Sequence, residues 1–210
     1  MKFNKEQIQT LQDIIYSRRD VRGHNFLDKK IGKDDLEKIL LSAIHAPSVG
    51  YTQPWKFIII DDESIKKEIR KNFDIENEKA KKIFENKDIY KKLKLEGIQE
   101  APINIAVFYE KQKNSNIGMT SMDKMGEYSV VCAVENMWLM ARALGIGLGW
   151  ISILDEKKVL KTLNAPKNVK LIAYLALGYV DKFYDEPELK TIEWKEEKTL
   201  DECVVANKWA

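Results

Sequence analysis

Residues 128–154 read YSVVCAVENMWLMARALGIGLGWISIL. The first part, 128–144, is long and mostly apolar, which is typical of a core helix that is buried on several sides. The glycine at 145 then predicts the end of the helix, because helices commonly stop at such a residue. The residues that follow predict a strand over 145–153. We expect Cys132, in the middle of the helix, to be a small core residue.

Further helices and strands are predicted on both sides of this stretch. Apolar residues spaced by three and four predict helices over 5–17 and about 33–45, and branched apolar runs predict strands over 55–62, 101–110 and 169–180. Because these elements do not alternate as regular βαβ units, we predict one α+β domain over residues 1–210.

Two segments lack a core pattern of their own. Residues 63–99 are densely charged with sparse apolar positions, so we expect exposed helices that cover a site as a lid. Residues 183–210 form a C-terminal extension, which we expect to wrap over another surface, such as that of a partner subunit.

The composition indicates which partners, cell compartment and metal sites to expect. The net charge of the 210 residues is +2, which gives no reason to expect a nucleic-acid or anionic-membrane partner. No apolar run approaches the roughly 20 residues that span a bilayer. The N-terminal residues lack the apolar region of a signal peptide, so we expect a cytoplasmic protein. The two cysteines and two histidines lack metal-ligand spacing, so no metal site is predicted.

Arginine is concentrated at one place. The sequence SRRDVR at 17–22 holds three of the five arginines of a chain that has 35 basic residues. Guanidinium groups bind phosphate through paired, charge-assisted hydrogen bonds, so Arg18, Arg19 and Arg22 are candidates for an anion site. The alternative is a solvated basic cluster paired with Asp20.

Two loops are further candidates. APSVGYTQPW at 46–55 offers a hydroxyl, a bare backbone and an amide that can bind the polar edge of a heterocycle, although an ordinary helix-to-strand turn has the same composition. In GIGLGWISIL at 145–154, glycines allow the backbone to approach a ligand closely. The alternative there is a glycine that ends a helix before a strand.

In order along the chain, these motifs resemble the nitroreductase family. The resemblance spans nearly the whole chain and is closer to its branch of 5,6-dimethylbenzimidazole synthases. It is carried by RRDVR (18–22), APSVG and QPW (46–55), LKLEGI (93–98), the run 128–154, YLALGYVD (174–181) and EPEL (186–189) before Trp194. The run 128–154 is the most specific of these.

The resemblance implies a mixed, mainly antiparallel sheet flanked by helices, in a homodimer with swapped C-terminal extensions and FMN at the interface. In this branch reduced FMN reacts with O2 and is fragmented to 5,6-dimethylbenzimidazole, the lower ligand of vitamin B12. Asp20 matches the catalytic acid, and Ser152 matches a serine that contacts the flavin. The other residues expected to bind the cofactor are Arg18, Arg19, Val21, Arg22, Pro47, Ser48, Gly50, Gln53, Gly149, Trp150, Ile151 and, in place of arginines that follow this tryptophan, Trp194, in the family, Lys195 or Lys198.

Three functions are therefore open. The first is the flavin-fragmenting synthase, supplied with reduced flavin by a separate reductase. The second is a nitroreductase or flavin oxidoreductase that uses NAD(P)H and keeps its FMN intact, and the third is a non-catalytic flavin-binding dimer. Asp20 together with Ser152 favours the first, because a plain reductase needs no acid at that position.

Overall fold

A computed structural model describes residues 2–84, 88, 90, 93–112 and 116–209. Its sheet has the strand order β1-β2-β4-β3, and every neighbouring pair is antiparallel. The strands are β1 (Trp55–Ile60), β2 (Ile103–Glu110), β3 (Ile146–Ile151) and β4 (Val169–Tyr179). This sheet and its helices confirm the predicted α+β class.

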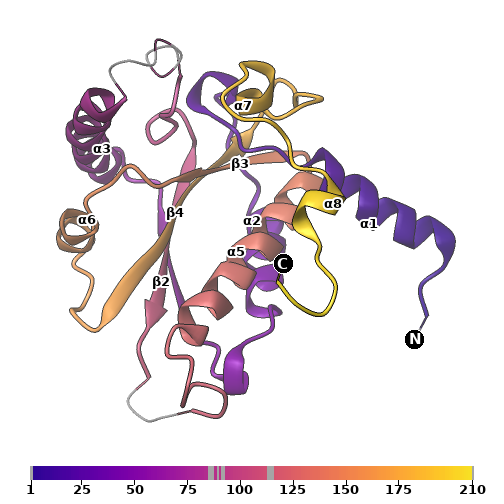
Figure 1. Cartoon of the computed structure of the whole chain (residues 1–210). Coiled ribbons are helices and arrows are strands. Elements are labelled where there is room, and N and C mark those ends of the chain that lie inside the picture. Colours follow the sequence, from indigo (N-terminus) through magenta and orange to yellow (C-terminus); the bar gives the residue numbers. More distant parts are fainter. Residues whose placement is uncertain (1, 85–87, 89, 91–92, 113–115, 210) are drawn as a thin grey trace.

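Helices cover both faces of the sheet (Figure 1). One face packs against α2 (Lys33–Ile44) and α5 (Met125–Ala143), and the other packs against α3 (Glu63–Ile83) and α6 (Glu156–Thr162). The side chains of β2 alternate between the two cores: Ile105 and Val107 join the α5 side, whereas Ala106 and Phe108 join the α3 side. The near-continuous apolar run of β2 follows from this burial on two faces.

The predicted elements agree with the structure within a few residues at their ends. The first helix is α1 (Lys5–Ser17), and strand β1 ends before Asp62, whose side chain caps α3. Helix α5 ends where Gly145 adopts a φ of 70°, a left-handed conformation that glycine adopts readily. The short, charged helix α6 is absent from the prediction.

The expectation for Cys132 is wrong. Its side chain is exposed, because α5 buries only part of its circumference against the sheet and α2. Tyr128 and Val131, which neighbour Cys132 on the helix surface, are 50% and 40% exposed. Apolar residues therefore lie on a face of α5 that this chain leaves exposed.

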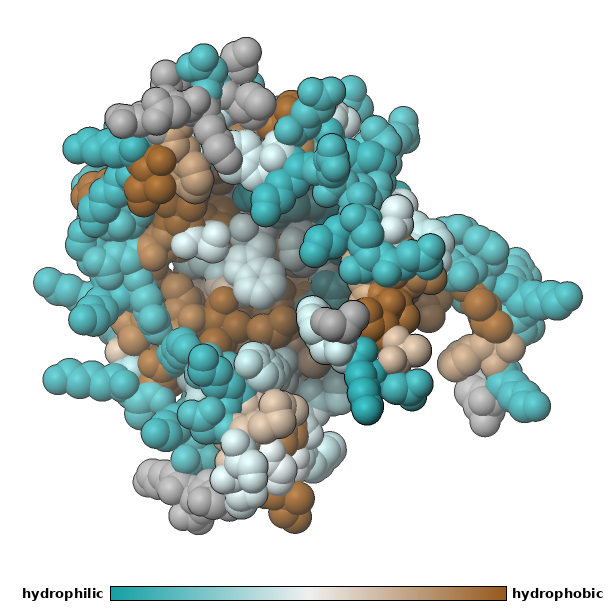
Figure 2. Space-filling model, in the orientation of Figure 1, coloured by the Kyte–Doolittle hydropathy of each residue, from teal (hydrophilic) through white to brown (hydrophobic). Residues whose placement is uncertain are grey.

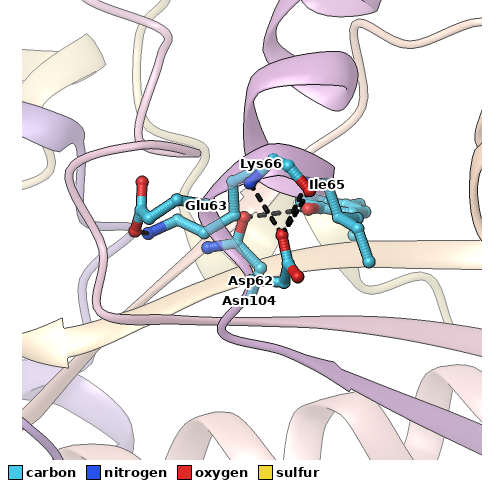
Figure 3. Close-up of polar contacts among 7 residues, drawn as sticks. Asp62, Glu63, Ile65, Lys66 and Asn104 are labelled. Carbon is cyan, nitrogen blue, oxygen red and sulfur yellow. Dashed lines mark hydrogen bonds and ion pairs between the residues drawn. The ribbon is translucent and has the colours of Figure 1, made fainter.

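Helix α3 is fixed to the sheet rather than exposed all round. Ile69 and Phe73 are buried against the sheet, and the side chain of Asp62 accepts hydrogen bonds from the first backbone N–H groups of the helix. A polar cluster that includes the buried Lys66 and Asn104 lies at the start of this helix (Figure 3). There the hydroxyl of Tyr174 donates to Asn104 Oδ1 at 2.8 Å, and Lys66 Nζ contacts Glu63 at 2.8 Å.

Helix α1 and the C-terminal extension bury little. Helix α1 has no buried residue and projects from the body of the molecule (Figure 1). In the extension, α7 (Glu188–Thr191) and α8 (Leu200–Cys203) also bury none. Figure 2 shows hydrophobic side chains at the surface around α8 and along α1. Exposed large apolar residues in these parts are Phe3, Ile8, Leu11, Ile15, Tyr16, Leu189, Leu200, Val204, Val205 and Trp209.

Candidate functional site

The arginine-rich segment lies along the free edge of β3. The N–H of Val21 donates to the carbonyl of Leu148 at 3.1 Å, and Asp20 and Leu148 form a parallel bridge. The segment is extended where it leaves α1, since Arg18 has φ −63° and ψ 135°. It continues to the short 3₁₀-helix η1 (Gly23–Asn25). The segment therefore acts as a short extra strand that brings Asp20 to the sheet.

Gly149 permits this close approach. A Cβ atom at position 149 would lie 2.1 Å from the carbonyl oxygen of Val21, which is closer than two such atoms can come. At position 147 a Cβ would lie 2.5 Å from a side-chain atom of Val180. Gly149 thus admits the backbone of Val21 and so places Asp20 against β3, while Gly147 leaves room for neighbouring valine side chains.

The carboxylate of Asp20 is held on both oxygens. Oδ1 accepts a hydrogen bond from the backbone N–H of Trp150 at 3.0 Å, and Oδ2 pairs with the guanidinium of Arg22. Burial raises the pKa of the carboxyl above its ordinary value, although Arg22, the Trp150 N–H and Arg18 all oppose the shift. A third of the side-chain surface remains accessible, so a proton can still leave or arrive.

The three arginines have different partners. Arg22 pairs with Asp20, and the guanidinium carbon of Arg18 lies 4.7 Å from the ring centre of Trp138. Arg19 turns back to the chain's own carbonyls and donates to those of Tyr16, Arg18 and Asp185, while its Nε has no hydrogen-bond partner among the described residues. Arg19 therefore satisfies carbonyls at the C-terminal end of α1, where the helix leaves them unpaired.

A small cavity opens beside Asp20. Its volume is about 120 Å³, and it also touches Arg19, Arg22 and Lys94. Residues 93–95 and the tail residues 184 and 186–189 complete the lining. Sites for drug-sized ligands are typically about 300–1,000 Å³, so this cavity holds only part of a larger molecule.

Segment 93–97 lies directly against the arginine-rich segment. The N–H of Gly23 donates to the carbonyl of Glu96 at 2.9 Å. This part of the predicted lid 63–99 borders the cavity, whereas α3 is packed on the sheet. Residues 85–87, 89 and 91–92 of that lid lie outside the described residues, and the lid stays a prediction.

The loop that holds Pro47, Ser48, Gly50 and Gln53 lies at the other end of α5. The N–H of Val49 donates to Ser129 Oγ at 3.1 Å, near the start of that helix. Trp138, which contacts the arginine-rich segment, is nine residues further along, or about 14 Å at 1.5 Å per residue. Figure 1 shows the two regions at opposite ends of α5. One chain does not bring them together.

That loop has an unusual backbone. Gly50, Tyr51 and Gln53 have φ values of 55°, 55° and 46°, a region that costs free energy for residues other than glycine. The Oγ of Ser48 accepts a hydrogen bond from the N–H of Gln53 at 3.1 Å, which closes the loop on itself. The side chains of Pro47 and Gln53 are exposed, so the loop presents them outward.

The remaining predicted residues lie at different distances from Asp20. Ser152 is exposed just after β3, two residues beyond Trp150, which corresponds to about 7 Å along an extended chain. The side chain of Ile151 is buried in the core on the α3 side. Lys195 is exposed in the tail and is not among the residues that line the cavity.

Reasoning from sequence missed three residues around Asp20. Lys94 lines the cavity, while Trp138 and Arg142 donate to carbonyls of the arginine-rich segment. The scarcity of arginine was a signal for Arg142, since it is one of only two arginines outside that segment.

The described residues form neither a metal site nor a membrane-spanning helix. Within the described ranges, no three His, Cys, Asp or Glu side chains are grouped so that they could hold a metal ion. No helix in the described part of the chain has the length and apolar character that crossing a membrane requires.

Comparison with known proteins gives consistent matches. Residues 15–179 match the Nitroreductase family. A 5,6-dimethylbenzimidazole synthase of Rhodospirillum rubrum is 37% identical over 189 residues, which cover 88% of this chain and 89% of that protein. One of Rhodobacter capsulatus is 32% identical over 200 residues, covering 93% and 96%. The structure of oxidized iodotyrosine deiodinase bound to FMN and 3-iodo-L-tyrosine has a TM-score of 0.72 and 26% identity, covering 95% of this chain and 100% of that one.

Proposed function

The chain belongs to the nitroreductase family, and on that basis we propose that it is an FMN-dependent oxidoreductase that fragments reduced FMN with O2 to give 5,6-dimethylbenzimidazole. The observation that carries the proposal is the environment of the Asp20 carboxyl group. This group has a raised pKa and is held against β3 by Trp150 and Arg22 at the wall of a cavity. The relatives that are 37% and 32% identical to this chain are named 5,6-dimethylbenzimidazole synthase.

The residues around the cavity suit part of FMN. Arg19, Arg22 and Lys94 bring positive charge, which Glu186 and Glu188 partly offset. Leu93, Leu95 and Leu189 bring apolar surface. Cationic groups suit a phosphate or the polar edge of the flavin ring, and apolar side chains suit its faces. Reduced FMN supplies the electrons that O2 accepts. We assign Arg22 and Lys94 to binding, with Lys195 as a further candidate for the phosphate.

Asp20 is then the acid–base residue. Fragmentation of a flavin ring requires protons to be moved to and from carbon and nitrogen, and a carboxyl whose pKa is raised keeps a proton available at a higher pH than an ordinary aspartate does. Ser152, near the end of the same strand, orients the ring by hydrogen bonding and does not act as a nucleophile. Segment 93–97 covers the site and limits the entry of water.

We further propose a homodimer with a composite site. The loop at 47–53 and the segment at 18–22 are separated along α5 within one chain, so a second copy is needed to place both against one flavin. The apolar faces of α1 and α5 are exposed, and the tail carries exposed apolar residues without a core. Exchange of the tails between subunits would bury these surfaces.

The electron donor and the cell compartment complete the proposal. We assign the supply of reduced flavin to a separate flavin reductase. Both cysteines are unpaired and exposed, which suits the reducing cytoplasm.

The test is a coupled reaction in air. Purified protein is mixed with FMN, NADH and an unrelated flavin reductase, and the products are analysed by mass spectrometry. We expect 5,6-dimethylbenzimidazole to accumulate at the expense of FMN. If FMN is recovered intact and the protein oxidises NADH when the reductase is omitted, the chain is an ordinary flavin oxidoreductase. If FMN is bound but neither reaction occurs, it is a flavin-binding protein.

A further inference from the structure

Two residues of α5 hold the backbone that leads to Asp20. The indole Nε1–H of Trp138 donates to the carbonyl of Arg19 at 3.1 Å, and Nε–H of Arg142 donates to the carbonyl of Ser17 at 2.9 Å. Positions 138 and 142 are four apart and so lie on one face of the helix. Their two acceptor carbonyls belong to the residues that flank Arg18, immediately before Asp20.

Each of the two side chains also has a second contact. Arg18 lies over the ring of Trp138, with its guanidinium carbon 4.7 Å from the ring centre. The guanidinium carbon of Arg142 lies 4.1 Å from the ring centre of Phe183, where the C-terminal extension begins. Arg142 thereby links the end of α1 to the tail that walls the cavity.

The segment is held from two sides as a result. The side chains of α5 bind its carbonyls at Ser17 and Arg19, and the backbone of β3 binds it at Asp20 and Val21. Carbonyls on an extended segment after a helix would otherwise face water and allow the segment to rotate. Fixing them on both sides of Arg18 sets the direction in which the next residue, Asp20, presents its carboxylate.

We propose that Trp138 and Arg142 are positioning residues that set the orientation of Asp20. Neither side chain is among those that line the cavity, so they act through the backbone of residues 17–19. The catalytic part of this inference rests on the proposed function, because it assumes that Asp20 transfers protons. The structural part, which concerns the bonds of Asp20 and Val21 to β3, does not depend on that assumption.

The variants are chosen to remove one bond each. Trp138→Phe keeps an aromatic ring beneath Arg18 but lacks the N–H, and Arg142→Lys keeps a cation near Phe183 but lacks the planar Nε–H. Arg70→Lys on α3 is the matched control. These conservative changes are intended to leave the fold intact, and unchanged amide exchange within α3 would verify it.

The first measurement is independent of activity. Hydrogen exchange of the backbone amides of Val21 and Trp150 reports the two bonds that join the segment to β3. We expect exchange to become about 3- to 10-fold faster in Trp138→Phe and Arg142→Lys, the usual effect of losing one hydrogen bond, and to stay unchanged in Arg70→Lys. Unchanged exchange in both variants would overturn the inference, whatever the protein catalyses.

The second measurement tests action through Asp20. We expect the rate of 5,6-dimethylbenzimidazole formation to fall about 10- to 100-fold in each variant, since a misplacement of about 1 Å can cost 100-fold. FMN affinity should change less than about twofold. In the background of Asp20→Asn the same substitutions should cost little more, because residues that act through one group are not additive. Additive losses would overturn the positioning role, whereas a wild-type protein that leaves flavin intact would instead contradict the proposed function.

Discussion

Asp20 is under opposing electrostatic influences. Burial raises the pKa of its carboxyl, while Arg22, the Trp150 N–H and Arg18 stabilise the charged form. The first influence is the larger, so the group retains its proton at a higher pH than an exposed aspartate does. A carboxyl group in this condition can both donate and accept a proton, which suits acid–base chemistry.

Replacement of Asp20 by asparagine separates binding from chemistry. Asn keeps the shape and can accept the hydrogen bond from Trp150, but it cannot exchange a proton as a carboxyl does. We expect FMN to bind at least as tightly, because a negative charge near the proposed phosphate contacts is removed. Formation of 5,6-dimethylbenzimidazole should fall by at least about 100-fold. Fluorescence titration measures the affinity for FMN, and mass spectrometry measures product formation. A near wild-type yield of 5,6-dimethylbenzimidazole would remove Asp20 from the mechanism.

The same substitution predicts a dependence of stability on pH. Because the pKa of Asp20 is raised above its ordinary value of 3.8, the folded protein binds this proton more tightly than the unfolded chain does. The stability of the wild type therefore falls as pH rises through the raised pKa. The Tm of Asp20→Asn relative to wild type should increase from below pH 3.8 to neutral pH.

Asp35→Asn is the control for this measurement. A hydrogen bond from Lys38 lowers the pKa of Asp35, so its charged form stabilises the fold. The Tm of this variant relative to wild type should decrease with rising pH over the corresponding range. If the Tm relative to wild type changed with pH in the same direction for both variants, the assigned directions of the two pKa shifts would be contradicted.

At the scale of secondary structure, β3 determines where Asp20 lies. It is an edge strand, so no other described strand of the sheet pairs with its outer edge. The parallel bridge to Asp20 occupies that edge, and the absence of a side chain at Gly149 makes the approach possible. Helix α5 supports the segment from the other side through Trp138 and Arg142.

Gly149→Ala should displace the segment from β3. The added methyl group would lie 2.1 Å from the carbonyl oxygen of Val21, and backbone on both sides leaves little room to relieve it. We expect a loss of about 1–3 kcal/mol in the free energy of unfolding, the usual cost of overpacking, together with loss of product formation. Gly32→Ser is the control, since a Cβ there meets nothing within 4 Å and serine is a favourable residue at this position, the N-cap of α2. Equal stability of the two variants in urea unfolding would show that the segment is not held as described.

The polar cluster at the start of α3 gives a second prediction at this scale. Asn104 is fully buried, and its Nδ2 has no hydrogen-bond partner among the described residues, so the bond from Tyr174 is its principal one. Tyr174→Phe should cost about 1–3 kcal/mol, because it leaves a buried oxygen unpaired. Adding Asn104→Leu should recover part of the loss, since both polar groups are then gone. Denaturant unfolding of the single and double variants measures this, and a further loss in the double variant would be the contrary result.

For the molecule as a whole, the exposed apolar faces support an oligomer. Helix α1 buries no residue, and Leu11 on it is 54% exposed. We expect the wild type to sediment as a dimer, and Leu11→Asp to shift it toward monomer with weaker FMN binding, because the composite site would be lost. Ile75→Asp on α3, where the side chain is 48% exposed, should leave the dimer unchanged. A wild-type monomer that binds FMN with full affinity would contradict the composite site.

Much of this protein could be predicted from its sequence. Apolar periodicity and branched runs place α1, α2, α5 and the four strands, because a side chain's place in the local pattern largely determines which face it buries. The scarcity of arginine identified the segment at 17–22, and the order of the motifs indicated the nitroreductase family. Helix α6 was missed because its sequence is short and charged, and only Val159 among its residues is fully buried.

Only the tertiary structure decided what each candidate residue contacts. Arg19 binds backbone carbonyls, Gly149 admits the chain's own carbonyl, and the loop at 47–53 lies at the far end of α5 from Asp20. Cys132 was assigned to the core because its neighbours in sequence are apolar, yet this helix face is uncovered. Periodicity records that a face is apolar, but what covers that face depends on segments distant in sequence and, in the proposed dimer, on a second chain.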